Sequence, residues 1–224
     1  MLRAYALLGF RRTPLPDIQL ARGCVRRNAL QKPTELVPLI QLLRSEELST
    51  VAEIGTAHGG TFWLWCRLAA PDATVVSMDL PGEFAGGGGS ADEVLPLLRG
   101  YGGEAQKLAF IRDDSHAPTA VEALISVLDG RQLDFLFIDG DHSYEGVKAD
   151  FETFAPFVKP GGLVAFHDTL PQQSWGVSTF WLEVRDRFES FEFVDPGDNR
   201  LGDTWGGIGV LRWHGDGESS PLSR

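Results

Sequence analysis

The stretch VAEIGTAHGGT, residues 51–61, decides the fold class of this chain. Its apolar beginning predicts a buried strand over 50–54, and the residues after it predict a helix over 59–70. Glycines between a strand and a helix let the backbone turn sharply and approach a ligand closely. In open parallel sheets, ligands bind at such loops, beyond the carboxyl ends of the strands. The stretch therefore predicts the first strand, loop and helix of a ligand-binding α/β domain.

Strand and helix patterns alternate along the rest of the chain, after a helix predicted over 35–45. Further strands are predicted over 73–78, 107–112, 133–138 and 162–166, with helices over 92–98, 118–128 and 144–158 between them. A helix over 177–188 precedes strands over 191–194 and 208–213, which only a loop separates, so these two can pair antiparallel. We therefore expect an α/β fold with a doubly wound, Rossmann-like sheet of about seven strands. The sheet should be mostly parallel with an antiparallel C-terminal hairpin, and helices should cover both faces.

The length of 224 residues fits a single domain. Residues 1–33 are basic and punctuated by prolines, and we expect an N-terminal extension that serves as a lid or as a contact in a homodimer. The domain itself is expected over 34–214, and a flexible tail over 215–224. The glycine-rich segment 82–90 (GEFAGGGGS) is expected to be mobile and to cover a bound ligand.

Charge and composition exclude several classes of protein. The formal net charge of −11 disfavours nucleic acid and anionic lipid as partners. Two cysteines are too few for a disulfide framework, and Cys66, within an apolar run, is expected to be a buried thiol. The apolar stretch 4–10 is much shorter than a membrane span and lacks the cleavage site of a signal peptide. These features predict a cytoplasmic protein whose partner is a small molecule, with no nucleic acid and no membrane.

The acid that ends the second predicted strand, taken with the spacing of the glycine-rich loop, distinguishes two kinds of nucleotide-binding site. Asp79 lies 24 residues after Gly55, where a carboxylate can accept hydrogen bonds from ribose hydroxyls. A dinucleotide-dependent oxidoreductase would also carry an acid there, but its loop has the spacing G-x-G-x-x-G. The present spacing is G-x-x-x-G-G, and Glu53 lies just inside the strand. That acid suits a ligand with a positive amino group better than a pyrophosphate, so the dinucleotide reading is disfavoured.

Two further segments carry a resemblance to a known family. EIGTAHGGT (53–61) resembles the first motif of class I S-adenosylmethionine-dependent methyltransferases, and FIDGDHSYEGVK (137–148) followed by PGGLVAFHD (160–168) is more specific. These segments resemble bacterial O-methyltransferases of natural-product and cell-surface glycan pathways. That family is similar to the metal-dependent O-methyltransferases of macrolide sugars and, more distantly, to catechol O-methyltransferase. The resemblance covers roughly residues 31–213. It implies methyl transfer from S-adenosyl-L-methionine to a hydroxyl group of a small molecule, such as a sugar or natural product.

The resemblance also implies where the cofactor binds. Glu53, Gly55 and Thr61 match positions that hold the methionine part, and Asp79 matches the ribose acid. Asp114 and Ser115 follow the third strand, where the relatives contact adenine. The expected cofactor-binding residues are Glu53, Gly55, Thr56, Ala57, His58, Gly59, Thr61, Asp79, Asp114, Ser115 and Asp139.

The implied chemistry lies at the ends of the fourth and fifth strands. In the metal-dependent relatives, the positions of Asp139, His167 and Asp168 are metal ligands. The histidine departs from the usual acid or amide pair, and imidazole shifts the preference from Mg²⁺ towards Mn²⁺, Fe²⁺ or Zn²⁺. His142 matches the catalytic base, and the ordinary pKa of histidine suits removal of a hydroxyl proton at neutral pH. The expected catalytic residues are His142 and Asp139, and the expected divalent metal ligands are Asp139, His167 and Asp168.

Other readings stay open from the sequence. The chain could bind the cofactor without transferase activity, or His142 could join the three metal positions in an iron site of hydroxylase type. Asp139 and Asp168 could also do no more than orient the two histidines. Trp175 and Trp205 are candidates for the wall of an acceptor site, because an aromatic plane suits a ring. Trp63, Trp65 and Trp181 lie on apolar helix faces and are expected in the core, and His116 is a candidate for the adenine pocket.

Overall fold

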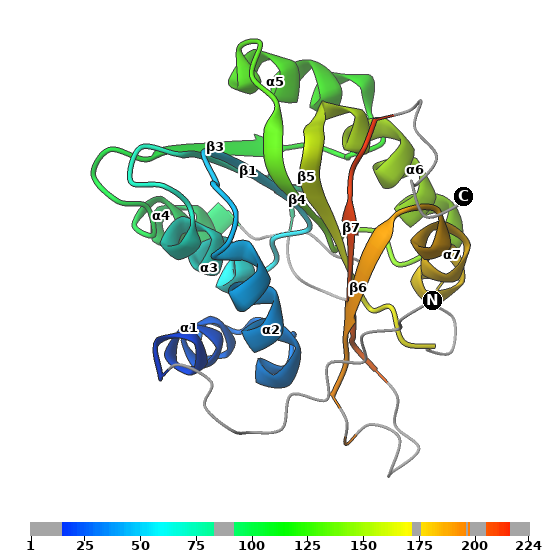
Figure 1. Cartoon of the computed structure of the whole chain (residues 1–224). Helices are drawn as coiled ribbons and strands as arrows, with labels where there is room; N and C mark the ends of the chain where they lie inside the picture. The colour runs from blue at the N-terminus through cyan, green and yellow to red at the C-terminus, as the bar shows by residue number, and fades with distance from the viewer. Residues whose placement is uncertain (1–14, 83–91, 172–175, 196, 198–204, 216–224) are drawn as a thin grey trace.

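A seven-stranded sheet forms the centre of the molecule (Figure 1). The computed structural model describes residues 15–82, 92–171, 176–195, 197 and 205–215. Its strands are β1 Thr50–Ile54, β2 Thr74–Asp79, β3 Lys107–Arg112, β4 Leu133–Ile138, β5 Val158–His167, β6 Glu189–Phe193 and β7 Ile208–Arg212. The strand order is β3-β2-β1-β4-β5-β7-β6. The first five strands pair parallel, whereas β7 pairs antiparallel with both β5 and β6. The predicted doubly wound sheet with its antiparallel hairpin is confirmed.

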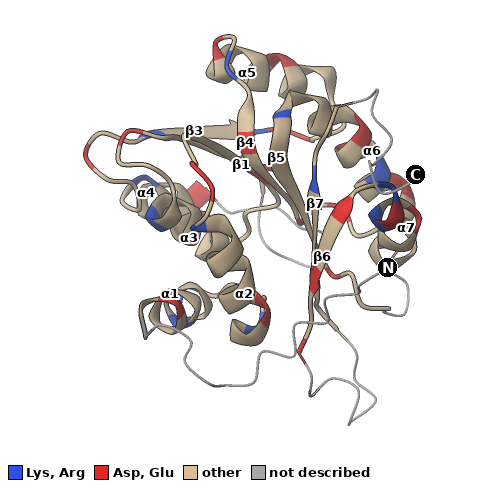
Figure 2. Ribbon diagram, viewed as in Figure 1, with Lys and Arg blue, Asp and Glu red and all other residues tan. Residues whose placement is uncertain are grey.

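Helices cover both faces of the sheet, as predicted. They are α1 Leu15–Val25, α2 Pro33–Leu43, α3 Gly60–Leu68, α4 Leu95–Arg99, α5 Pro118–Leu128, α6 Tyr144–Phe154 and α7 Val177–Val184. Helices α1 to α4 lie on one side of the sheet and α5 to α7 on the other (Figure 1). Lysine and arginine lie on outer elements such as α1 and α4 (Figure 2). Among the described helices, none is long and apolar enough to span a membrane.

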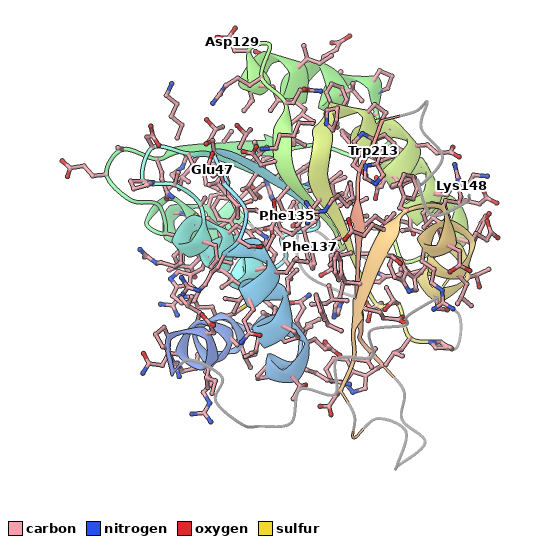
Figure 3. The ribbon with its side chains drawn as sticks, viewed as in Figure 1. Glu47, Asp129, Phe135, Phe137, Lys148 and Trp213 are labelled. Atoms are coloured by element: carbon pink, nitrogen blue, oxygen red, sulfur yellow. The ribbon has the colours of Figure 1, made fainter. Side chains whose placement is uncertain are left out.

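Successive strand residues face opposite cores, because side chains alternate across a strand. Val51 and Val75 pack with α1 to α3, whereas Ala52 and Val76 pack with α5 to α7. Phe135 and Phe137 lie at the centre of the molecule (Figure 3), with the Trp65 ring centroid 5.0 and 5.2 Å from theirs. The predicted burial of Trp63, Trp65, Trp181 and the Cys66 thiol is confirmed.

The described part of the predicted N-terminal extension contains a packed helix. Helix α1 contacts α2 and α3, and Ala21 and Cys24 are completely buried. Asp17 on α1 pairs with Arg44, with 2.7 Å between Oδ1 and Nε. From residue 15 onward this segment therefore belongs to the helical layer, although composition had suggested an appendage. Its role as a lid or dimer contact stays a prediction, and residues 1–14, Trp175 and most of the segment 82–90 lie outside the described residues.

Helices α6 and α7 each end four residues earlier than their apolar patterns suggest. Helix α6 gives way at Ala155 to a 3-10 turn, Ala155–Phe157, since Pro156 has no N–H to continue the α-helical hydrogen bonds. Helix α7 is likewise followed by a 3-10 turn, Arg185–Arg187. The predicted turn at 159–162 lies within β5, where a register shift against β4 lets Gly161 adopt a φ of 84°. These differences lie away from the carboxyl ends of the parallel strands.

Candidate functional site

A cavity of about 860 Å³ opens at the carboxyl ends of the parallel strands. Its walls come from the β1–α3 loop, the ends of β2 and β5, and the loops that follow β3 and β4. In a doubly wound sheet this edge is where ligands bind. Two stretches of its rim differ in construction. We call them the loop rim, at the ends of β1 and β2, and the cluster rim, at the ends of β4 and β5.

Backbone hydrogen bonds to one carboxylate shape the loop rim. Asp79 Oδ2 accepts hydrogen bonds from the backbone N–H groups of Thr56, at 3.1 Å, and Ala57, at 2.8 Å. Gly55 has a φ of 86°, which side chains rarely adopt, and a Cβ there would lie 2.0 Å from the carbonyl oxygen of Asp139. Glycine is therefore required at Gly55 both by the turn and by the closeness of the loop after β4.

Most of the predicted cofactor residues line this cavity. Those that do are Gly55, Thr56, Ala57, Thr61, Asp79, Asp114, Ser115 and Asp139. His116 also lines it, as predicted for the adenine side.

Three predicted cofactor residues lie elsewhere. Glu53 is fully buried behind the loop, where its Oε2 accepts a hydrogen bond of 2.7 Å from Trp65 Nε1, and burial raises the pKa of its carboxyl to about 8. His58 faces a second cavity of about 420 Å³. Gly59 caps α3 and packs against Leu98. These three residues therefore lie outside the lining of the main cavity.

The cluster rim brings together two aspartates and two histidines. His142 Nε2 lies 3.1 Å from Asp168 Oδ2 and 3.6 Å from Asp139 Oδ1. His167 Nδ1 lies 3.2 Å from Asp139 Oδ1 and 3.1 Å from Asp168 Oδ2. Since β4 and β5 are neighbours, their ends place all four side chains on one edge, as the sequence predicted.

The grouping of possible metal ligands differs from the predicted set. Asp139, His142 and Asp168 each offer a ligand atom, and these atoms lie within 4.8 Å of one another. His167, which the sequence placed in the set, contacts the same two carboxylates but is almost completely buried. Carboxylate oxygens and an imidazole nitrogen form a donor set that suits Mn²⁺, Fe²⁺ or Zn²⁺, and the two carboxylates also suit Mg²⁺. The residues present therefore fit a divalent cation.

The two carboxylates change the protonation of both histidines. Burial lowers the pKa of the His142 imidazole, but hydrogen bonds with Asp139 and Asp168 outweigh burial and raise it to about 9. The pKa of His167 is raised well above its ordinary value by the same carboxylates, again against the effect of burial. Hydrogen bonds from the two histidines hold the pKa of Asp168 well below its ordinary value. Without a cation, the cluster is a set of ion pairs.

Two residues that were not predicted as site residues contact the cluster, although both lie far from it in the sequence. Gln31 Nε2 donates a 2.7 Å hydrogen bond to Asp139 Oδ2, across 108 positions of sequence. Glu35 is fully buried, and its Oε2 lies 3.9 Å from His167 Nε2. Glu35 also accepts hydrogen bonds from the backbone N–H groups of Lys32, at 3.1 Å, and Gly207, at 2.9 Å. Its position at the start of α2 indicates helix capping, and its burial beneath Gly207 is visible only in the fold.

The cavity also has an aromatic wall and a buried acid near its adenine side. Trp205 lines the cavity and is 42% exposed, and its role as the wall of an acceptor site stays a prediction. His116 Nε2 lies 3.3 Å from Asp150 Oδ1, on α6. Asp150 is fully buried, and burial raises the pKa of its carboxyl to about 6.

Comparison with known proteins gives one family match. The model of a methyltransferase domain family matches residues 52–169, which include the loop rim and the cluster rim. The protein y4gI of Sinorhizobium fredii is 30% identical over 172 residues, covering 73% of this chain and 17% of y4gI. A mimivirus protein, R132 of Acanthamoeba polyphaga mimivirus, is 43% identical over 49 residues, and this match covers 22% of R132. The chain therefore spans about a fifth of the length of these curated relatives.

Solved structures share the fold at low identity. The MycE methyltransferase of the mycinamycin pathway, in complex with Mg, SAH and mycinamycin VI, has a TM-score of 0.58 and 16% identity, over 92% of this chain and 56% of MycE. An O-methyltransferase from Bacillus cereus, in complex with SAH, has a TM-score of 0.58 and 15% identity, over 94% of this chain and 96% of its own. An rRNA methylase from Streptococcus thermophilus has a TM-score of 0.56 and 13% identity, over 83% of this chain and 99% of its own.

Proposed function

The chain belongs to the methyltransferase domain family, and from this premise we propose that it transfers a methyl group from S-adenosyl-L-methionine to a hydroxyl group of a small molecule. The observation that carries the proposal is that the loop rim and the cluster rim open on one cavity. One rim is built to hold a nucleoside and the other to handle a proton. A single cavity with both can bring a donor and an acceptor together.

The loop rim fits the cofactor. Asp79, at the end of β2, lines the cavity at the position where a carboxylate can receive ribose hydroxyls. Gly55, Thr56 and Ala57 line the cavity beside it, and the backbone N–H groups of Thr56 and Ala57 bond to its carboxylate. Asp114 and Ser115 line the part of the cavity next to β3, where adenine would lie. We assign Gly55, Thr56, Ala57 and Thr61 to the methionine part, with Glu53 acting through the loop that it supports.

The cluster rim supplies acid–base chemistry. We assign His142 as the group that accepts the proton of the acceptor hydroxyl, and Asp139 and Asp168 as the carboxylates that orient it. His167 contacts both carboxylates and lies on the buried side of the cluster. When bound, the cofactor supplies a methyl group on a positively charged sulfur. A divalent cation held by Asp139 and Asp168, and not by His142, would offset the two carboxylates, leave His142 neutral and able to accept a proton, and lower the pKa of the hydroxyl.

The chain's own contribution to the rate is mainly positional. As the acceptor oxygen bonds to the methyl carbon and the carbon–sulfur bond breaks, the hydroxyl proton goes to His142. A positioned base contributes about 10²–10⁴-fold. Fixing the acceptor in line with the methyl group contributes roughly 7–11 kcal/mol to lowering the barrier. Gln31 and Trp205 line the same cavity as His142, and we assign this cavity as the place where an acceptor would be held.

A small molecule is favoured over nucleic acid as the acceptor, although rRNA methylases share the fold. A nucleic-acid substrate needs lysine and arginine along its path, and this chain has a formal net charge of −11. A hydroxylase-type iron site is the second candidate, because Asp139, His142 and Asp168 form a ligand group with His167 beside it. The loop rim favours the methyltransferase, since hydroxylase chemistry has no need of a nucleoside site. A cytoplasmic location and pairing into a homodimer stay predictions.

The test is a calorimetric titration of S-adenosyl-L-methionine into wild type and an Asp79→Asn variant. Asparagine keeps an oxygen for the backbone N–H groups of Thr56 and Ala57 but removes the charge that ribose would bind. We expect micromolar binding by wild type and a loss of about 1.5–3 kcal/mol in the variant. Asp186→Asn, at an exposed acid remote from the cavity, should bind like wild type. Equal affinity in the Asp79 and Asp186 variants contradicts the ribose assignment, and no binding by wild type contradicts the proposed function.

A further inference from the structure

The charges that line the main cavity are almost all negative. Six aspartates line it, against three histidines. They are Asp79, Asp113, Asp114, Asp139, Asp141 and Asp168. Among the described residues of the lining there is neither a lysine nor an arginine, although basic residues lie elsewhere, on α1 and α4 (Figure 2), namely Arg22 and Arg99. Even with Asp139 and Asp168 offset within the cluster rim, four aspartates of the lining remain, against a single further histidine, His116.

The hydrogen-bonding groups of the lining are mainly acceptors. Gln31 is 4% exposed and lines the cavity, and its Nε2 is already engaged with Asp139. Its Oε1 is buried and has no hydrogen-bond partner among the described residues. A buried acceptor without a partner is costly, so a ligand that brings an N–H or O–H donor gains affinity there. Carboxylates of the lining have the same preference for donors.

Two large apolar side chains lie at the cavity beside these acceptors. Leu30 is 63% exposed and Trp205 is 42% exposed, and both line the cavity. The ammonium of Lys32 lies 4.0 Å from the Trp205 ring centroid, so one cation already uses this aromatic ring. That ammonium donates to the Trp205 carbonyl, at 2.7 Å, and lies 3.9 Å from the buried Glu35, which offsets its charge. Exposed apolar groups at a cavity favour an apolar or ring-bearing ligand.

We propose that the acceptor is a ring-bearing alcohol or phenol that carries a positively charged amine, and that Asp141 is the carboxylate that recognises the amine. The proposal rests on the proposed function and names its substrate class. Asp141 is exposed at the cavity and lies outside the group of possible metal ligands. Its Oδ1 accepts a 2.8 Å hydrogen bond from the backbone N–H of Ser143, and this bond fixes its position next to His142. An acceptor with a carboxylate or phosphate would instead meet unbalanced charges of its own sign.

The experiment uses three phenols that share a ring and a hydroxyl and differ in charge. Tyramine is a cation, 4-ethylphenol is neutral and 4-hydroxyphenylacetate is an anion. Each is titrated into the full chain saturated with S-adenosylhomocysteine, at low salt and at about 1 M salt, where exposed charges are screened beyond ~3 Å. We expect tyramine to bind roughly tenfold more tightly than 4-ethylphenol at low salt. The anion should bind most weakly, and the differences should shrink at high salt.

The Asp141→Asn variant assigns the preference to one residue. It should lose most of the advantage of tyramine over 4-ethylphenol, whereas Asp186→Asn should keep it. The proposal is overturned if 4-hydroxyphenylacetate binds as tightly as tyramine or more tightly. It is also overturned if none of the three phenols binds. A preference that Asp141→Asn leaves unchanged overturns the assignment of Asp141. If S-adenosylhomocysteine itself fails to bind, the proposed function fails separately, and titration of the phenols into the free chain still decides the charge preference.

Discussion

The loop rim and the cluster rim share one cavity but depend on different parts of the chain. The loop rim is made of backbone, and its one essential side chain, Asp79, holds two neighbouring N–H groups. The cluster rim is made of side chains whose charges balance only as a group, with partners as distant as Gln31 and Glu35. We therefore expect the loop rim, built from local backbone, to tolerate remote change, whereas the charge cluster should depend on every member and on the fold behind it.

The largest effect is expected from breaking the cluster at Asp168. In Asp168→Asn, His142 and His167 lose the carboxylate that lies 3.1 Å from each. Removing one partner of a buried ion pair costs about 3 kcal/mol, and urea unfolding should show a loss of this size. Titration with Mn²⁺ should show a large loss of affinity.

The matched control for this substitution is Asp129→Asn, at the exposed end of α5 (Figure 3). Both aspartates have a positive φ, 61° at Asp168 and 50° at Asp129, and asparagine tolerates that conformation. Equal stability and equal Mn²⁺ affinity in the two variants would mean that the cluster does not depend on Asp168.

A second substitution tests the point where the two rims touch. In Gly55→Ala the new Cβ would lie 2.0 Å from the Asp139 carbonyl oxygen. Gly161→Ala is the matched control, because Gly161 has a similar φ, 84° against 86°, and nothing within 4 Å of its Cβ. Both variants therefore carry the same cost of placing alanine at a positive φ. We expect Gly55→Ala to be less stable than the control by about 2 kcal/mol in thermal or urea unfolding. Equal stabilities would show that the loop rim does not press on the loop after β4.

The support behind the cluster is tested by Glu35→Gln. Glutamine fills the same volume and keeps one oxygen for Gly207, but it removes the charge that lies 3.9 Å from His167. We expect a loss of about 1–2 kcal/mol in unfolding free energy and a weaker affinity for Mn²⁺. Glu152→Gln, at a largely exposed acid of α6, is the control for the change of charge. If both variants behave like wild type, Glu35 caps α2 and does nothing for the cluster.

The smallest effect concerns pH and the buried Asp150. Its folded-state pKa is raised from 3.8 to about 6 by burial, so the folded chain binds this proton more tightly than the unfolded chain. The free energy of unfolding should therefore fall as pH rises from about 4 to 6, by on the order of 1 kcal/mol. Asp150→Asn should remove this part of the slope in urea unfolding across that range. A steeper slope in the variant would contradict the direction of the shift.

The loop rim could be predicted from sequence because all of its determinants lie within about thirty consecutive residues. A glycine-rich turn after an apolar strand, and an acid at the end of the next strand, give both the topology and the place of Asp79. Strands β1, β3 and β4 were predicted to the residue, whereas β5 begins four residues and β6 two residues before its predicted start. Helix α1 was not predicted, since its contacts are with Trp63 and Arg44 and its own apolar pattern is weak.

The cluster rim could be predicted only in part. Strand ends gave Asp139, His142, His167 and Asp168, but not that Asp139, His142 and Asp168 form a possible ligand group while His167 is buried behind them. That grouping depends on side-chain directions at the end of β5 and on Glu35, 132 positions before His167. Gln31 and Glu35 are polar residues at the start of a helix, where sequence indicates capping or exposure. Only their burial against the cluster reveals a second role.

The proposed methyltransferase site is tested by a sequential titration of the chelator-treated chain, first with S-adenosylhomocysteine and then with Mn²⁺. We expect micromolar binding of the nucleoside to wild type and to Asp168→Asn alike, followed by binding of Mn²⁺ to wild type only. Binding of neither ligand would contradict the claim that the loop rim and the cluster rim form one methyltransferase site. Binding of Mn²⁺ without the nucleoside would favour the iron-type alternative.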